Sequence, residues 1–237
     1  MIVTQKEIWV EHTKDMSVES VCNSYRSPAI FQRELADLIN SENNGGIILE
    51  AGCETGVLSM LLNENFTKVL LDYNEDAIEL AKGAFYELGK RASFITEDMF
   101  DLGGVDSKFD IIFNAGVLEH FSYEERVLVF REFTRILKSG GLMYIAVPNH
   151  YSFPYRLAYI IRNLFGKWQY PKENKIYDFS KELSCISNLE MIDRIVLSRK
   201  SLMNWLDFSL PLKKIFSLLD TIFSYEGYLT VIKIRKI

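Results

Sequence analysis

Residues 49–56 read LEAGCETG, in which two glycines enclose a short turn directly after an apolar segment. Gly52 lets the chain turn sharply out of a strand, and Gly56 lets the next helix begin close to the sheet and to a ligand. The dinucleotide pattern G-x-G-x-x-G does not fit, because position 54 is Glu and Val57 follows Gly56. A Walker loop is excluded, since no Gly-Lys-Ser or Gly-Lys-Thr follows. The turn therefore predicts a different nucleotide-like ligand.

Acidic side chains accompany this turn. Glu50 precedes it, and Asp72 ends the next apolar segment, 22 positions later. A pyrophosphate would be repelled by these carboxylates. S-adenosylmethionine carries a sulfonium and an α-ammonium, for which Glu50 is a suitable partner, while the helix start offers N–H groups to its carboxylate. Asp72 can accept both ribose hydroxyls, although this feature alone does not separate S-adenosylmethionine from NAD.

Two later loops complete the predicted cofactor site. In the segment TEDMF, Asp98 is positioned to accept the adenine amino proton and Met99 to cover the ring. In NAGVLEHF, the backbone of Asn114 is expected to face the methionine part of the ligand.

The elements that must position these residues alternate along the chain. Continuous apolar segments predict strands at 47–51, 68–73, 93–96, 109–115 and 142–148, and helical periodicity predicts helices at 28–40, 57–65, 75–88 and 122–137. Strands of this kind, separated by helices, indicate a parallel sheet covered on both faces, which is a doubly wound α/β fold. In such a sheet the loops after the strands converge on one crevice, where ligands bind.

The helix after residue 121 has the clearest boundaries. Ser122 and Glu125 form a capping box at its start, and we expect Ser139, Gly140 and Gly141 to end it. Its buried stripe should comprise Val127, Phe130, Phe133 and Leu137.

The sequence changes character after Pro148. Residues 151–170 are aromatic and basic, and they are followed by a predicted helix at 178–188, a strand at 191–198, a helix at 201–223 broken at Pro211, and an edge strand at 228–236. The aromatic stretch has three interpretations: a lid over the acceptor site, an interfacial helix with basic residues toward lipid headgroups, or core packing. We favour the lid.

Composition sets the broad class. The chain has 237 residues, 48% of them hydrophobic, which suffices for a single α/β domain with appendages. No apolar run reaches the length of a membrane span and no signal peptide pattern is present, so a cytoplasmic protein is expected. The three cysteines fit neither a disulfide framework nor a metal site.

Charge is unevenly distributed. Residues 1–150 contain 13 Lys and Arg against 24 Asp and Glu, a net charge of −11, whereas residues 151–237 have a net charge of +6. The acidic part argues against nucleic-acid binding, and the basic, aromatic part favours an anionic or lipid-like partner.

These motifs together resemble one family, the class I S-adenosylmethionine-dependent methyltransferases, in particular the broad small-molecule group called type 11. The matching segments are LEAGCETG, LLDYNEDAIELAK, ITEDMFDL, FDIIFNAGVLEHF and ILKSGGLMYIAVPN. The resemblance covers about residues 25–150 and fits the last strands more loosely. It implies a Rossmann-like, seven-stranded sheet whose last strand is antiparallel, with S-adenosylmethionine as cofactor. Glu54 departs from it, since the family most often has Gly there.

The resemblance also implies a division of the chain and a set of cofactor residues. A single domain would comprise an N-terminal helical region (1–44), a cofactor-binding core (45–150), an aromatic and basic cap (151–178) and a C-terminal part that completes the sheet around a helical insertion (179–237). The cofactor residues would be Glu50, Gly52, Cys53, Thr55, Gly56, Asp72, Tyr73, Asp98, Met99 and Asn114. Tyr25 and Arg33 are candidates to close over the cofactor, although a solvated helix face is the simpler interpretation of Arg33.

The expected reaction is in-line methyl transfer to a small, apolar or aromatic molecule. His120 is the candidate base, because it follows the fourth strand beside Glu119; the alternative is that it only packs against its loop. Glu119, His150 and Tyr151 are candidate substrate residues. His12 and His150 have no evident partners in the sequence, and no metal is expected. The sequence predicts no oligomeric state.

Two other functions compete with this one. A cofactor-binding domain without turnover is suggested by Glu54. An NAD-dependent oxidoreductase is disfavoured by the missing third glycine and by Glu50.

Overall fold

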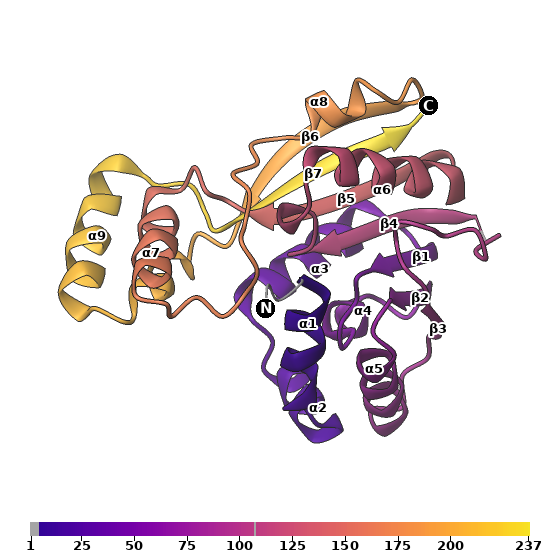
Figure 1. The fold of residues 1–237 in the computed structure, drawn as a ribbon, viewed down its shortest axis with the longest axis horizontal. Coiled ribbons are helices and arrows are strands. Elements are labelled where there is room, and N and C mark those ends of the chain that lie inside the picture. The colour runs from indigo at the N-terminus through magenta and orange to yellow at the C-terminus, as the bar shows by residue number, and fades with distance from the viewer. Residues whose placement is uncertain (1–4, 107) are drawn as a thin grey trace.

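The computed structural model describes residues 5–106 and 108–237 and contains one seven-stranded sheet (Figure 1). The strands are β1 (Gly46–Ala51), β2 (Phe66–Asp72), β3 (Ser93–Thr96), β4 (Phe109–Ala115), β5 (Leu137–Pro148), β6 (Leu189–Leu197) and β7 (Leu229–Lys236). Their order is β3-β2-β1-β4-β5-β7-β6. The pairs from β3 to β5 are parallel, and β7 is antiparallel to both β5 and β6. The predicted doubly wound fold with an antiparallel last strand is confirmed.

Helices cover both faces of this sheet. One face packs against α2 (Val18–Arg26), α3 (Ile30–Glu42), α4 (Val57–Leu61) and α5 (Glu75–Glu87), and the other against α6 (Tyr123–Ile136) and α8 (Ser180–Leu183). Successive strand residues point to opposite faces of the sheet. Ile111 and Phe113 therefore face α3, while Ile112 packs with the residues of α6. Burial on both faces explains the continuous apolar runs in the sequence.

Three details of the predicted elements differ from the structure. The glycine pair Gly140–Gly141 lies within β5 and does not follow the helix, because β5 begins at Leu137 and its pairing with β4 shifts register there. The helical stretch predicted at 201–223 is interrupted, but the break lies before Pro211, which occupies the first turn of α9 (Leu210–Phe223), where its missing N–H costs nothing. The last strand is not an edge strand, since β7 lies between β5 and β6.

The polar N-terminal stretch, for which no element was predicted, contains α2 and a further helix, α1 (Gln5–Lys14). The helix expected from residue 28 begins at Ile30, after an Ala29 N–H that donates to Gln32 Oε1 at 2.9 Å. Cys22, Cys53 and Cys185 form no disulfide. Within the described residues, no helix is long and apolar enough to cross a bilayer.

Three helical segments extend beyond the sheet at the left of Figure 1: α7 (Phe153–Leu164), the 3-10 turn η2 (Leu202–Leu206) and α9. We call them the α7–η2–α9 projection. Ala158, Leu206 and Phe216 form a small core of its own. Aromatic rings connect it to the domain, with Tyr155 of α7 lying 4.9 Å from Trp205 and 5.0 Å from Tyr228.

Candidate active site

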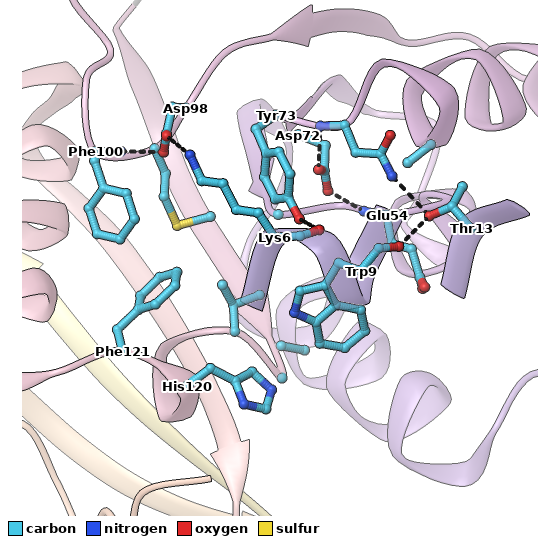
Figure 2. A pocket seen from close by; sticks show the side chains of 17 residues that line it. Lys6, Trp9, Thr13, Glu54, Asp72, Tyr73, Asp98, Phe100, His120 and Phe121 are labelled. Atoms are coloured by element: carbon cyan, nitrogen blue, oxygen red, sulfur yellow. Dashed lines mark hydrogen bonds and ion pairs between the residues drawn. The ribbon is translucent and has the colours of Figure 1, made fainter. Parts of the chain in front are cut away.

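A pocket lies at the carboxyl ends of β1 to β4, with α1 forming one wall (Figure 2). Its empty volume, including space open to solvent at the mouth, is about 800 Å³. The lining residues come from α1 (Lys6, Trp9, Thr13), the turn after β1 (Gly52, Glu54), the β2–α5 segment (Asp72, Tyr73, Asn74, Ala77), the loop after β3 (Asp98, Met99, Phe100) and the β4–α6 segment (Ala115, Gly116, Val117, His120, Phe121). This is the crevice that the strand order of a doubly wound sheet creates.

The turn after β1 requires its glycines. Gly52 has φ +72°, and a Cβ there would lie 3.0 Å from Val117 and 3.1 Å from Met99 in the pocket. At Gly56, with φ +71°, a Cβ would collide with Leu70 at 2.2 Å. Glu54 adopts φ 48°, a left-handed conformation that costs an ordinary residue roughly 1–2 kcal/mol. The backbone at position 54 therefore still has the shape that a glycine would favour.

The side chain of Glu54 reaches toward α1. Its Oε1 lies 3.1 Å from Nδ1 of His12, and this hydrogen bond raises the pKa of the imidazole. His12 therefore has a partner that the sequence did not reveal. Both side chains are partly exposed, at 34% for His12 and 40% for Glu54, so the carboxylate lines the pocket without filling it.

Asp72 lies at the tip of β2 and fixes the neighbouring turn. Its carboxylate accepts the backbone N–H of Glu54 at 2.8 Å and that of Asn74 at 3.0 Å. Burial raises its pKa above the ordinary value for an aspartate. Each carboxylate oxygen retains a lone pair, so the group can still accept hydroxyl donors in the pocket.

Asp98 lines the pocket in the loop after β3, and the side chains of Lys6 and Tyr73 lie between it and Asp72 in Figure 2. Its Oδ1 accepts the N–H of Phe100 at 3.1 Å, and its Oδ2 lies 2.5 Å from Nζ of Lys6. A ligand that donates to Asp98 would share this carboxylate with the lysine of α1.

Glu50 lies behind the pocket wall. It is buried, it accepts the N–H of Ser59 at 3.1 Å, and burial raises its pKa to about 8. Asn114 is also fully buried, and within the described residues neither polar atom of its side chain has a hydrogen-bond partner. Cys53, Thr55 and Gly56 form the turn without lining the pocket.

His120 lies on the opposite wall, in the 3-10 turn η1 (Leu118–His120). Its Nδ1 lies 3.2 Å from the carbonyl oxygen of Lys172, which can only accept, so Nδ1 carries the hydrogen. Its Nε2 is 3.7 Å from Oε1 of Glu119. Burial lowers the pKa of His120, which favours the neutral imidazole.

A buried polar cluster lies behind His120. Burial and the nearby Glu173 raise the pKa of Glu119 well above its ordinary value. Glu173 accepts the hydroxyl of Tyr155 at 2.8 Å and lies 2.8 Å from Nε2 of His150. His150, expected to have no partner, is therefore paired and 1% exposed. Tyr151 is 47% exposed and lies outside the pocket.

The predicted site residues thus separate into two groups. The structure places Gly52, Asp72, Tyr73, Asp98, Met99 and His120 on the pocket wall, and leaves Glu50, Cys53, Thr55, Gly56, Asn114, Glu119, His150 and Tyr151 off it. Tyr25 and Arg33 are not part of the wall either. Helix α1 closes this side instead, through Lys6, Trp9 and Thr13.

The charges of the lining fit a nucleoside without phosphates. Among the described residues that form it, the carboxylates are Glu54, Asp72 and Asp98, and the basic side chain is Lys6, already paired with Asp98. A pyrophosphate would meet net negative charge, whereas a sulfonium would be attracted. Asp72 and Asp98 are the residues that would hold ribose and adenine.

Comparison with known families supports the resemblance found in the sequence. Residues 48–141, which contain the glycine turn and the loops after β2, β3 and β4, match the family described as "Methyltransferase domain". Residues 48–141 are thus similar to that methyltransferase family. The match agrees with the enzyme class and the cofactor, S-adenosylmethionine, that the sequence motifs indicated.

Curated relatives of this chain differ in their named substrates. Phosphoethanolamine N-methyltransferase 1 of Triticum aestivum is 27% identical over 146 residues, which cover 60% of this chain and 29% of that protein. Probable tRNA methyltransferase 9B of Homo sapiens is 28% identical over 138 residues, covering 54% of this chain and 29% of that protein. The chain thus spans less than a third of either relative.

Solved structures share the fold of this chain. Magnesium protoporphyrin IX methyltransferase from Synechocystis PCC 6803, with bound SAH, superposes with a TM-score of 0.59 at 14% identity. The match covers 87% of this chain and 82% of that chain. The sheet order and the antiparallel β7 are therefore those of the family fold.

Proposed function

We propose that this chain transfers a methyl group from S-adenosylmethionine to a small, apolar or aromatic acceptor. The observation that carries the proposal is the acidic pocket, in which Gly52 leaves room for a ligand and Asp72 and Asp98 both line the wall. When bound, S-adenosylmethionine supplies a methyl group on a positively charged sulfur. The protein must hold an acceptor in line with that group and exclude water, effects that together reach roughly 7–11 kcal/mol in favourable cases.

Aromatic side chains support an apolar acceptor. Beyond His120 the ring of Trp9 lies 5.9 Å from that of Tyr170, which lies 5.7 Å from Trp168. The segment that carries Trp168 and Tyr170 is joined to the pocket wall, because Asn174 donates to the carbonyl oxygens of Glu119 and Phe121 at 2.9 Å. This arrangement supports the lid interpretation of the aromatic cap. Relatives with small-molecule names support a small acceptor as well.

His120 is the proposed base for acceptors that must lose a proton. Its Nε2 takes the proton, since Nδ1 already donates to Lys172, and Glu119 at 3.7 Å lies next to the imidazolium that results. Because its pKa is lowered, His120 remains ready to accept a proton at neutral pH and below. The expected activity therefore falls only as the pH decreases through that lowered pKa.

The test begins with calorimetry of S-adenosylmethionine binding. Asp72→Asn removes the negative charge at nearly constant shape and should weaken binding by about 1–3 kcal/mol. Asp37→Asn on the exposed face of α3 is the control and should change nothing. Unchanged affinity in Asp72→Asn would place the ribose elsewhere, and tight binding of NAD would overturn the assignment.

Turnover is measured separately, with methyl-labelled S-adenosylmethionine and a panel of small apolar molecules, peptides and RNA. Labelling of an apolar small molecule that is lost in His120→Gln supports the whole proposal. Binding without transfer to any acceptor would favour a domain that has lost turnover, and labelling only of peptides or RNA would refute the proposed acceptor.

A further inference from the structure

The outer face of α9 is apolar and has no protein partner in the described residues. Ile215, Leu218 and Ile222 follow one another at helical spacing and are 52%, 67% and 70% exposed. The opposite face packs through Phe216 against Ala158 and Leu206. An ordinary surface helix is apolar on one side only, so this second apolar side requires its own explanation.

Two more exposed apolar side chains lie at the end of α7. Leu164 is 78% exposed and Phe165 is 73% exposed, and α7 and α9 stand beside each other at the far end of the projection (Figure 1). Ring contact between Phe153 of α7 and Phe216 of α9, at 5.6 Å, agrees with this arrangement. Exposed apolar side chains that gather in this way mark an interaction surface.

Charge indicates the kind of partner. Residues 151–170 contain three basic residues, Arg156, Arg162 and Lys167, and no acidic ones. Residues 199–224 contain four basic and two acidic residues, and each acid is paired, Asp207 with Lys213 and Asp220 with Arg199. The projection therefore carries net positive charge, whereas residues 1–150 carry −11.

We propose that the α7–η2–α9 projection docks on an anionic lipid bilayer, with the outer face of α9 at the boundary between headgroups and acyl chains. A helix with apolar side chains on one face and lysines beside them lies in the plane of such an interface. Lys214 of α9 meets the headgroups, while the acidic body is repelled and stays in water. No described helix is long and apolar enough to span the bilayer, which is consistent with surface contact.

This proposal stands apart from methyl transfer, since no residue of the α9 outer face lines the pocket.

The experiment is vesicle flotation of the full chain. Phosphatidylcholine vesicles are compared with vesicles in which part of that lipid is replaced by phosphatidylserine. We expect binding to the anionic vesicles that weakens with added salt, and little binding to the neutral ones. The double variant Leu218→Ser, Ile222→Ser should reduce the bound fraction at least about tenfold, because it removes two apolar side chains from the interface.

A matched control separates surface contact from general hydrophobicity. Leu128 of α6 and Ile192 of β6 are also exposed, at 47% and 38%, and their double substitution by Ser should leave binding unchanged. Lys214→Glu should weaken binding to anionic vesicles only. Urea denaturation of the same samples verifies that each variant is folded.

Two outcomes overturn the proposal. One is equal recovery of the wild-type chain and the Leu218→Ser, Ile222→Ser variant with anionic vesicles. The other is a concentration-dependent dimer in light scattering that the same variant abolishes, which would show that a second copy covers α9. A chain that floats with vesicles but binds no S-adenosylmethionine would refute methyl transfer and leave the docking intact.

Discussion

Helix α1 and the α7–η2–α9 projection both lie at the carboxyl end of the sheet, and they are held there by different kinds of contact. Partly exposed polar contacts tie α1 to the loops after β1, β2 and β3: Lys6 with Asp98, His12 with Glu54, and the hydroxyl of Tyr73, which donates to the Lys6 carbonyl at 3.2 Å. The ring of Trp9 adds a contact with Tyr170 at 5.9 Å. Aromatic packing around the fully buried Tyr155 holds the projection. Water competes for the polar contacts of α1, but it does not compete for the buried aromatic packing of the projection.

The difference predicts how each part opens. Partly exposed ion pairs contribute about 0–1 kcal/mol each, so α1 can detach while the rest of the domain stays folded. Buried aromatic packing makes the projection open only with global unfolding. A detachable α1 suits the entry of a cofactor, whereas a fixed projection suits a permanent docking surface.

The largest expected effect is on the projection. Tyr155→Ala should lower the free energy of unfolding by about 3–5 kcal/mol, because it leaves a cavity among Trp205 and Tyr228 and removes a donor from Glu173. Urea denaturation measures this loss. The exposed Tyr151→Ala should stay within about 0.5 kcal/mol of the wild-type chain. If Tyr155→Ala lowered the free energy of unfolding no more than Tyr151→Ala does, aromatic packing would not hold the projection.

A smaller effect is expected for Glu54→Gly. The substitution relieves left-handed strain of roughly 1–2 kcal/mol and removes an ion pair worth about 0–1 kcal/mol, so the global free energy of unfolding should be unchanged or slightly higher. Hydrogen exchange in α1 should accelerate by up to about fivefold, since the contact to His12 is lost.

Ser224, at the end of α9, provides the control for strain. It adopts φ 49° and lies far from α1 in the chain and in the fold, so Ser224→Gly should relieve similar strain without changing exchange in α1. Equal acceleration of α1 exchange in both variants would contradict the proposed role of Glu54.

The smallest expected effect is a pH dependence of α1. Because Glu54 raises the pKa of His12, the contact stabilises docked α1 fully below the ordinary histidine pKa of about 6.5 and is lost as the pH rises through the raised value. Protection of α1 amides, corrected for intrinsic exchange, should therefore decrease with pH by at most about 1 kcal/mol. His12→Gln should abolish the trend, and protection that increases with pH would contradict it.

The sequence predicted the strands well where both faces are buried. The strands at 93–96 and 109–115 were placed at their observed ends, because continuous apolarity bounded by polar residues encodes such strands locally. Strand β7 was predicted but assigned to the edge of the sheet. Its alternating pattern does not reveal that β6 pairs with it on the side away from β5.

The site was predicted in the same uneven way. Asp72, Asp98 and His120 each follow a predicted strand, and the doubly wound topology brings such positions together. Lys6, Trp9 and Thr13 were missed, because they lie on a helix that precedes the sheet and no local pattern indicates what it covers.

The amino-acid order by itself thus determined the glycine turn and the acidic groups at the strand tips, since backbone conformation and charge are properties of short segments. Only the tertiary structure decided where Glu54 points, with His12 as its partner 42 positions away, and that Glu119 lies near Glu173. Such pairings depend on distances that exist only once the whole chain has packed.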